Sequence, residues 1–228
     1  MQITSIRLTR IVRSACAPAL ALLVIAGSVQ AQTVMVSNLG EEAGGYGAFV
    51  NDTIAGDPYV LNVASDFTTG NEAATLESIT LLFDANSSGS GFVLSLYSAG
   101  EGQPGFLLET LSGPDSPGEA AAYTYSSVNA TPLEANTTYW WVGSVGNGQF
   151  NYRNTYSPAE TGAAGWSIGD SSSFTQLNGG AWESSGGAQV RFSVSVTSAV
   201  PEPGTYAAFG GAAALGFAVW RRFTRKQK

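Results

Sequence analysis

The sequence contains no histidine, and its single cysteine is Cys16. Without histidine, Ser-His-Asp and Cys-His catalytic arrangements cannot form, and the usual zinc sites lose a common ligand. Cys16 lies in an N-terminal segment that we expect to be removed, so the mature protein has no disulfide and no thiol nucleophile. The rest of the chain must be stabilised by burial of its core, for which about 170 residues suffice.

Charged residues are also scarce, at 12% of the sequence, and they are unevenly distributed. Residues 32–200 contain sixteen acidic residues but only two basic ones, Arg153 and Arg191, which gives this stretch a net charge of −14. Nucleic-acid binding depends on clustered Lys and Arg, so this composition excludes it. The abundance of Gly favours short strands joined by turns over long surface helices, which usually carry Lys and Glu.

The N-terminus has the organisation of a secretory signal. Three arginines precede an apolar run at residues 15–27, and small or compact residues follow it up to Ala31. The alternative, a short buried helix or a retained anchor, is disfavoured because the run is short for a membrane span. We therefore predict that residues 1–31 are a signal peptide, removed by signal peptidase before Gln32.

The C-terminus combines an apolar stretch with a basic tail. Residues 204–220 carry no charge and as a helix would extend roughly 25 Å, close to the thickness of a bilayer core. Arg221 and Arg222 begin the tail 221–228, which the positive-inside bias keeps in the cytoplasm. The alternative, a C-terminal helix docked on the body, should show a polar face. We therefore predict a transmembrane helix at 204–220, with the body across the inner membrane.

The residues just before this stretch are Val200, Pro201, Glu202 and Pro203. This motif, the apolar stretch and the basic cluster, in this order, resemble the PEP-CTERM sorting signal of Gram-negative bacteria. The resemblance implies that an exosortase, an integral-membrane enzyme, cleaves near the motif. It also implies an inner-membrane precursor and then a protein at the cell surface or in the extracellular matrix, often in bacteria that make exopolysaccharide.

Between the two ends, apolar residues recur with a period of two, which is typical of strands. In residues 188–197 the apolar residues alternate cleanly with polar ones, which predicts one buried face and one wet face. Residues 137–145 are apolar on both faces and predict a central strand. Further strands are predicted at 34–39, 59–67, 75–83, 91–98, 107–111, 123–128, 149–154 and 165–174.

Strands of this number and spacing, separated by Gly- and Pro-rich turns, predict an all-β fold. We expect one antiparallel β-sandwich at 32–198, jelly-roll-like, followed by the sorting region 199–228. The stretches 64–70, 76–83, 94–105 and 133–142 resemble choice-of-anchor domains of type R, which are β-rich surface domains with alternative C-terminal anchors. That family has no established catalytic residues, so the resemblance implies none here.

Two groups of polar residues are candidates for chemistry. Asp84, Asn86 and Ser88 have the spacing of a calcium loop, but Ser95 stands where such a loop needs a bidentate Glu. A hairpin turn explains the stretch without metal, so we predict no cofactor and keep the three residues as metal candidates. The carboxylates that a glycosidase would pair are expected to be solvated surface groups near turns and strand ends: Glu109, Glu119, Glu134 and Glu183.

Aromatic residues in the second half of the chain suggest binding. The candidates are Trp140, Trp141, Trp166 and Trp182. In a strand, the adjacent Trp140 and Trp141 must face opposite sides. Exposed aromatic rings can stack on sugars, whereas core packing is the alternative interpretation.

We therefore interpret the chain as an exported, non-enzymatic protein with a structural or interaction role. Its expected partners are signal peptidase, an exosortase and, before processing, the inner membrane. One alternative is a carbohydrate-binding module for extracellular polysaccharide. A second is a histidine-free glycoside hydrolase that uses two carboxylates.

Overall fold

The structure is a computed structural model that describes residues 32–85, 87–157, 160–169, 174–184 and 188–197, with 211, 212, 215 and 216. The described residues of the body form fifteen strands, and the pairings between them are antiparallel. The predicted all-β class is confirmed. The predicted signal peptide, the motif at 200–203, most of the predicted transmembrane helix and the basic tail lie outside the described residues.

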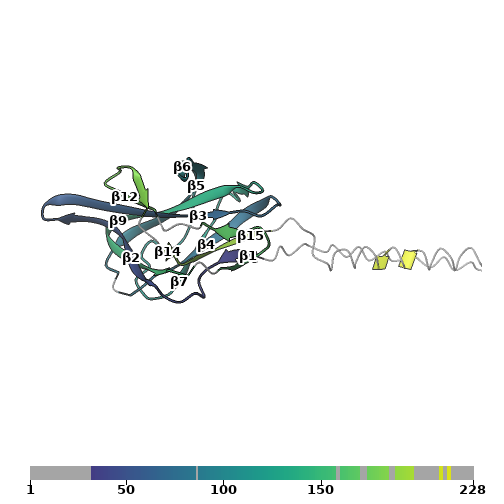
Figure 1. Cartoon of the computed structure of the whole chain (residues 1–228). Helices are drawn as coiled ribbons and strands as arrows, with labels where there is room; N and C mark the ends of the chain where they lie inside the picture. The colour runs from purple at the N-terminus through teal and green to yellow at the C-terminus, as the bar shows by residue number, and fades with distance from the viewer. Residues whose placement is uncertain are drawn as a thin grey trace, which may run out of the picture.

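The strands are divided between two sheets (Figure 1). The smaller sheet consists of β1 (Gln32–Ser37), β4 (Ala74–Leu82), β7 (Ala122–Ser126), β8 (Pro132–Leu133), β10 (Thr161–Gly162) and β15 (Phe192–Thr197). The larger sheet consists of β2 (Gly45–Ile54), β3 (Asp57–Thr68), β5 (Ser90–Gly100), β6 (Gln103–Thr110), β9 (Thr138–Thr155), β11 (Ser167–Ile168), β12 (Phe174–Leu177), β13 (Trp182–Ser184) and β14 (Gln189–Val190).

The order of the strands is different from their order in the chain. In the smaller sheet it is β10-β1-β15-β4-β7, with β8 also paired to β4. In the larger sheet it is β13-β12-β3-β2-β9-β5-β6, with β11 on β3 and β14 on β9. The hairpins β2–β3, β5–β6 and β12–β13 pair strands that are consecutive in the chain, whereas the other pairings join distant parts of the sequence, and β6 and β13 lie at the edges of the larger sheet.

The long strand β9 organises the larger sheet. Its first part, Thr138–Gly143, pairs with β3, and its later part, Gly148–Asn154, pairs with β2, while β5 runs along it as well. The sequence predicts two separate strands here, and that division is wrong. The strand continues through Gly148 because this residue has φ +79° and a Cβ on it would collide with the backbone of Ser88.

Two other segments also differ from the sequence prediction. β2 is not predicted, because two glycines dilute its apolar pattern. Gly47 is needed there, since a Cβ at this position would collide with the ring of Tyr152. Of the predicted strand 165–174, only β11 and the first residue of β12 are strand among the described residues.

β15 departs from the prediction in its burial. Its apolar residues face the core as expected, but Ser193 and Ser195 on the other face are only 5% and 4% exposed. β15 lies between β1 and β4, and Gln32 of β1 donates a hydrogen bond across it to the hydroxyl of Ser78 on β4 (2.8 Å). The predicted wet face is therefore wrong, because side chains from the two neighbouring strands cover the small serines.

One large apolar cluster connects the two sheets. It contains residues of the smaller sheet, such as Ile79 and Phe192, together with residues of the larger sheet, such as Phe49 and Trp141. The rings of Trp141 and Phe192 meet edge to face with centroids 5.4 Å apart. The two sheets thus share a core, as the absence of cysteine from the body requires.

Three hairpins turn through a pair of residues that both have positive φ. Ala55-Gly56 joins β2 to β3 and Glu101-Gly102 joins β5 to β6, whereas Asn178-Gly179 begins the longer connection 178–181 between β12 and β13. This is the type I′ geometry, whose twist matches that of the strands. The β2–β3 hairpin, dark blue in Figure 1, extends beyond the other strands on the side away from β1 and β15.

The two ends of the body lie side by side. Gln32 is the cross-strand partner of Thr197, the last residue of β15. Thr197 pairs on its other side with Thr75, and Thr75 also pairs with Pro132. These four residues form one row across the smaller sheet, with a spacing of about 4.8 Å from strand to strand. The chain therefore enters and leaves the body at the same end.

Candidate functional site

The structure buries three of the four tryptophans that the sequence suggests for sugar binding. Trp141 is 0% exposed and lies in the core shared by the sheets. Trp140 is 3% exposed and faces the other side of the larger sheet, where it packs with Ala64 and Val142. The prediction that the two adjacent rings face opposite sides is confirmed, and so is the central position of their strand.

Trp166 and Trp182 have different surroundings. Trp166 is buried and stacks on Phe67, with ring centroids 6.3 Å apart and an interplanar angle of 7°. Trp182 is half-buried and packs against the cluster around Trp140. A ring whose faces are packed against protein cannot stack on a sugar, so only Trp182 keeps a partly accessible ring.

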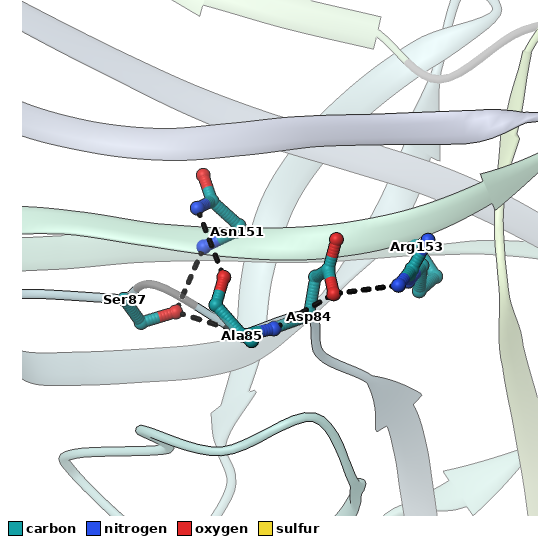
Figure 2. Close-up of polar contacts among 5 residues, drawn as sticks. All are labelled: Asp84, Ala85, Ser87, Asn151 and Arg153. Carbon is teal, nitrogen blue, oxygen red and sulfur yellow. Dashed lines mark hydrogen bonds and ion pairs between the residues drawn. The ribbon is translucent and has the colours of Figure 1, made fainter.

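The candidate calcium loop is attached to β9 by polar contacts (Figure 2). The carboxylate of Asp84 forms an ion pair with Arg153 (2.7 Å) and accepts a hydrogen bond from the N–H of Ala85 (2.7 Å). The backbone N–H of Asn151 donates to the hydroxyl of Ser87 (3.1 Å). The polar residues of this turn therefore have a structural role, because they attach the turn to β9.

Asn86 lies outside the described residues. No group of three Asp, Glu, His or Cys suited to a metal occurs among the residues described.

Glu109 is the main correction among the carboxylates, because it is 2% exposed and not a surface group. One carboxylate oxygen accepts hydrogen bonds from the backbone N–H groups of Val128 (2.6 Å) and Asn129 (2.7 Å). The other accepts from the hydroxyls of Ser127 (2.8 Å) and Thr131. Burial alone would raise the pKa of Glu109, but these four hydrogen bonds hold the pKa below its ordinary value.

The chemical role of Glu109 follows from these contacts. A carboxylate that accepts four hydrogen bonds, with a lowered pKa, is poorly suited to take up or donate a proton near neutral pH. Glu119, Glu134 and Glu183 are exposed, as the sequence predicts. Glu109 therefore holds the loop 127–131 in place, and the sequence gives no sign of this because two of its four partners are backbone N–H groups.

A groove of about 760 Å³ lies beside this loop. Its walls come from β5, β6, the segment after β7 and the start of β9, with Leu108, Asn129, Thr131, Asn136 and Tyr139 among the lining residues. Of the described residues that line it, none is charged.

The edge strand β6 is unusually apolar next to this groove. Phe106, Leu107 and Leu108 are 85%, 55% and 41% exposed. The backbone N–H of Phe106 donates to the hydroxyl of Ser98 (3.0 Å), and Ser98 lines the groove. Sequence reasoning missed this groove. The signal available was the run of three apolar residues, which breaks the alternation expected of a half-buried strand.

The groove lies near the end of the body where the chain enters and leaves. Pro132 lines it and stands in the same row as Thr75, Thr197 and Gln32, three strands from Gln32.

The sequence that follows Thr197 decides the identity of the C-terminal region. Residues 199–222 match the PEP-CTERM protein-sorting motif.

This sorting motif contains the predicted residues Val200, Pro201, Glu202 and Pro203 and extends to Arg222. It indicates a protein that an exosortase processes and that is exported to the cell envelope or surface. The match covers only the C-terminal region, and no curated protein matches the chain. The resemblance of the body to choice-of-anchor domains stays a prediction. None of the described residues belongs to a helix with the length and apolar character needed to cross a membrane.

Proposed function

We propose that the body is a non-enzymatic interaction or structural domain, carried as a membrane-held precursor and placed at the cell surface or in the extracellular matrix after exosortase processing. The observation that carries this proposal is the sorting motif at 199–222. It begins two residues after Thr197, where β15 ends, so the region to be processed follows directly on the folded body.

We also propose that the two sheets form a jelly-roll sandwich. Without the short strands and β2, the order is β1-β15-β4-β7 in one sheet and β3-β9-β5-β6 in the other. The chain passes between the sheets from β1 to β3, from β3 to β4, from β4 to β5, from β6 to β7, from β7 to β9 and from β9 to β15. Such alternation supports a double Greek key spread over two sheets, which is the jelly-roll arrangement.

The chemistry of the body supports a non-enzymatic role. The sequence has no histidine, and Cys16 precedes the body. The buried carboxylate of Glu109 is used by hydrogen bonds within the protein. A two-carboxylate glycosidase needs one carboxyl with a raised pKa, whereas the pKa of Glu109 is lowered.

The sorting part of the proposal is tested by replacing Pro201, Glu202 and Pro203 with alanine in a host that has the matching exosortase. The segment should be extended in the wild type, because each proline disfavours helix at the residue before it, and an extended segment is accessible to a protease. We expect the variant to be exported and to fold but to stay in the inner membrane at its full mass without the signal peptide.

A control with Ser198→Ala, just before the matched residues 199–222, should be processed like wild type. Cell fractionation and intact-mass measurement give the result. Trimming and release of the triple variant at the wild-type rate would show that the motif is not what the processing enzyme recognises.

A further inference from the structure

We propose that the groove beside β6 binds an uncharged polysaccharide chain. The inference deepens the proposed function. It rests on that function only for the location of the protein, at the cell surface or in the extracellular matrix, where polysaccharide chains occur. It differs from the binding site that the sequence suggests, because the tryptophans of that site are mostly buried, whereas the groove is open and Phe106, whose backbone contacts the lining residue Ser98, is exposed.

The polar groups of the groove suit hydroxyl-rich ligands. Asn129 and Asn136 are exposed, and within the described part of the chain their side-chain amides form no hydrogen bond. Each amide offers one acceptor oxygen and two N–H donors, and a sugar hydroxyl both donates and accepts. The hydroxyls of Thr131 and Thr137 donate instead to Glu109 and to the carbonyl of Ala135. The two carboxamides are therefore available for recognition.

The apolar surface of the groove completes this pattern. Leu108 and Pro132 line it, and the exposed Phe106 lies two residues before Leu108 on β6. Pyranose rings have C–H faces that pack against such surfaces, while their hydroxyls point outward to polar groups. A concave apolar surface with a few placed hydrogen-bonding groups is the usual composition of a ligand site, and contiguous exposed apolar residues indicate an interaction surface.

The absence of charged side chains among the described residues that line the groove favours an uncharged polysaccharide over a charged one. A polyanion would find no cation there and would approach a body with a net charge of −14 over residues 32–200. A polycation would find no carboxylate in the groove, since the carboxylate of Glu109 is buried behind the loop.

The groove is also rigid before any ligand binds. Glu109 fixes residues 127–131 through four hydrogen bonds. The backbone N–H of Asn136 donates to the carbonyl of Gly70 (2.7 Å), which fixes the backbone that carries the second carboxamide. Because these segments need little further ordering, more of the contact energy remains for binding. Glu109 is thus a positioning residue for the site, since it acts through the loop.

The test uses the exported protein purified from its host, in detergent if it keeps its C-terminal region. Binding is measured by affinity electrophoresis and calorimetry. The probes are dextran, laminarin and galactomannan, the neutral and acidic polysaccharide fractions of the host culture, and alginate and chitosan as charged references. We expect at least one neutral probe to bind and alginate not to bind, while any binding of chitosan to the acidic body should not respond to variants in the groove.

The variants are Phe106→Ala, Asn129→Ala and Asn136→Gly. Glycine is chosen at Asn136 because its φ of +50° strains other side chains. Each variant should weaken binding on the order of tenfold, the effect of one lost contact. Tyr46→Ala, another exposed aromatic, and Asn178→Gly, another Asn with positive φ, are matched controls and should stay within about twofold of wild type.

The inference is overturned if no neutral probe binds, if binding does not respond to the three groove variants, or if only a charged polymer or an unfolded polypeptide such as casein binds at the groove. C-terminal processing is measured on the same variants. Normal processing with lost binding separates a failure of this inference from a failure of the sorting proposal.

Discussion

Glu109 and Thr131 are 22 residues apart in the chain, and the hydroxyl of Thr131 donates a hydrogen bond to the buried carboxylate of Glu109. This contact and the three others to the same carboxylate connect the edge strand β6 to the loop that forms one wall of the groove. Stability and the shape of the groove therefore depend on the same ionised group.

We predict that Glu109→Gln lowers the free energy of unfolding at pH 7 by about 1–3 kcal/mol, because the new NH₂ group faces donors and cannot accept from them. The pKa of Glu109 is lowered in the folded protein. Its stabilisation is thus present above the unfolded-state pKa, about 4.3, and is lost as the pH falls through the folded-state value.

The measurement is urea unfolding between pH 7 and pH 3. Wild type should lose stability below about pH 4.3, and Glu109→Gln should have a flatter profile in that range. Glu119→Gln, at an exposed carboxylate, is the control. If the free energy of unfolding depended on pH in the same way in wild type and Glu109→Gln, this carboxylate would not be the cause of the loss of stability at low pH.

We predict that the two faces of the larger sheet respond differently to truncation of a tryptophan. Trp141 is fully buried between the sheets, so Trp141→Ala should cost about 3–5 kcal/mol. Trp182 is half-buried at the outer cluster, so Trp182→Ala should cost about 1 kcal/mol. Chemical denaturation gives both values, and equal costs would contradict the division between a shared core and an outer cluster.

We predict that the Asp84 turn is stable without metal. The Asp84–Arg153 pair is partly exposed, with relative side-chain areas of 16% and 37%, so a double-mutant cycle with Asp84→Asn and Arg153→Gln should give a coupling of at most about 1 kcal/mol. Chelator and added calcium should leave the Tm unchanged. A fall of more than about 5 °C with chelator would instead indicate a metal that binds the folded state.

Much of the fold could be predicted from local pattern. Alternation in residues 188–197 located β15, and the two-sided apolar run at 137–145 located the centre of the larger sheet. The continuity of β9 could not be predicted, because Gly148 looks like a turn residue in the sequence. Its actual role, to let the backbone of Ser88 approach, depends on a strand pairing that local pattern does not contain.

The candidate site was harder to predict than the fold. Burial of a carboxylate such as Glu109 is rare without partners, and its partners lie about twenty residues away, two of them backbone N–H groups. The tryptophans are candidates for binding in the sequence because large aromatic rings serve both ligand binding and core packing. Whether a tryptophan is exposed or buried depends on whether other parts of the protein cover its face of the strand. The arrangement of the two sheets determines this, and the local sequence does not show it.

The pairing of Gln32 with Thr197 makes the body suitable for circular permutation. A short linker could join these residues, with new ends opened at the Ala55-Gly56 turn, and the strand pairings would be retained. For the same reason the body can be inserted into, or fused onto, another chain through two adjacent attachment points. A change of the segments attached at these two points would therefore leave the strand pairings of the body unaltered.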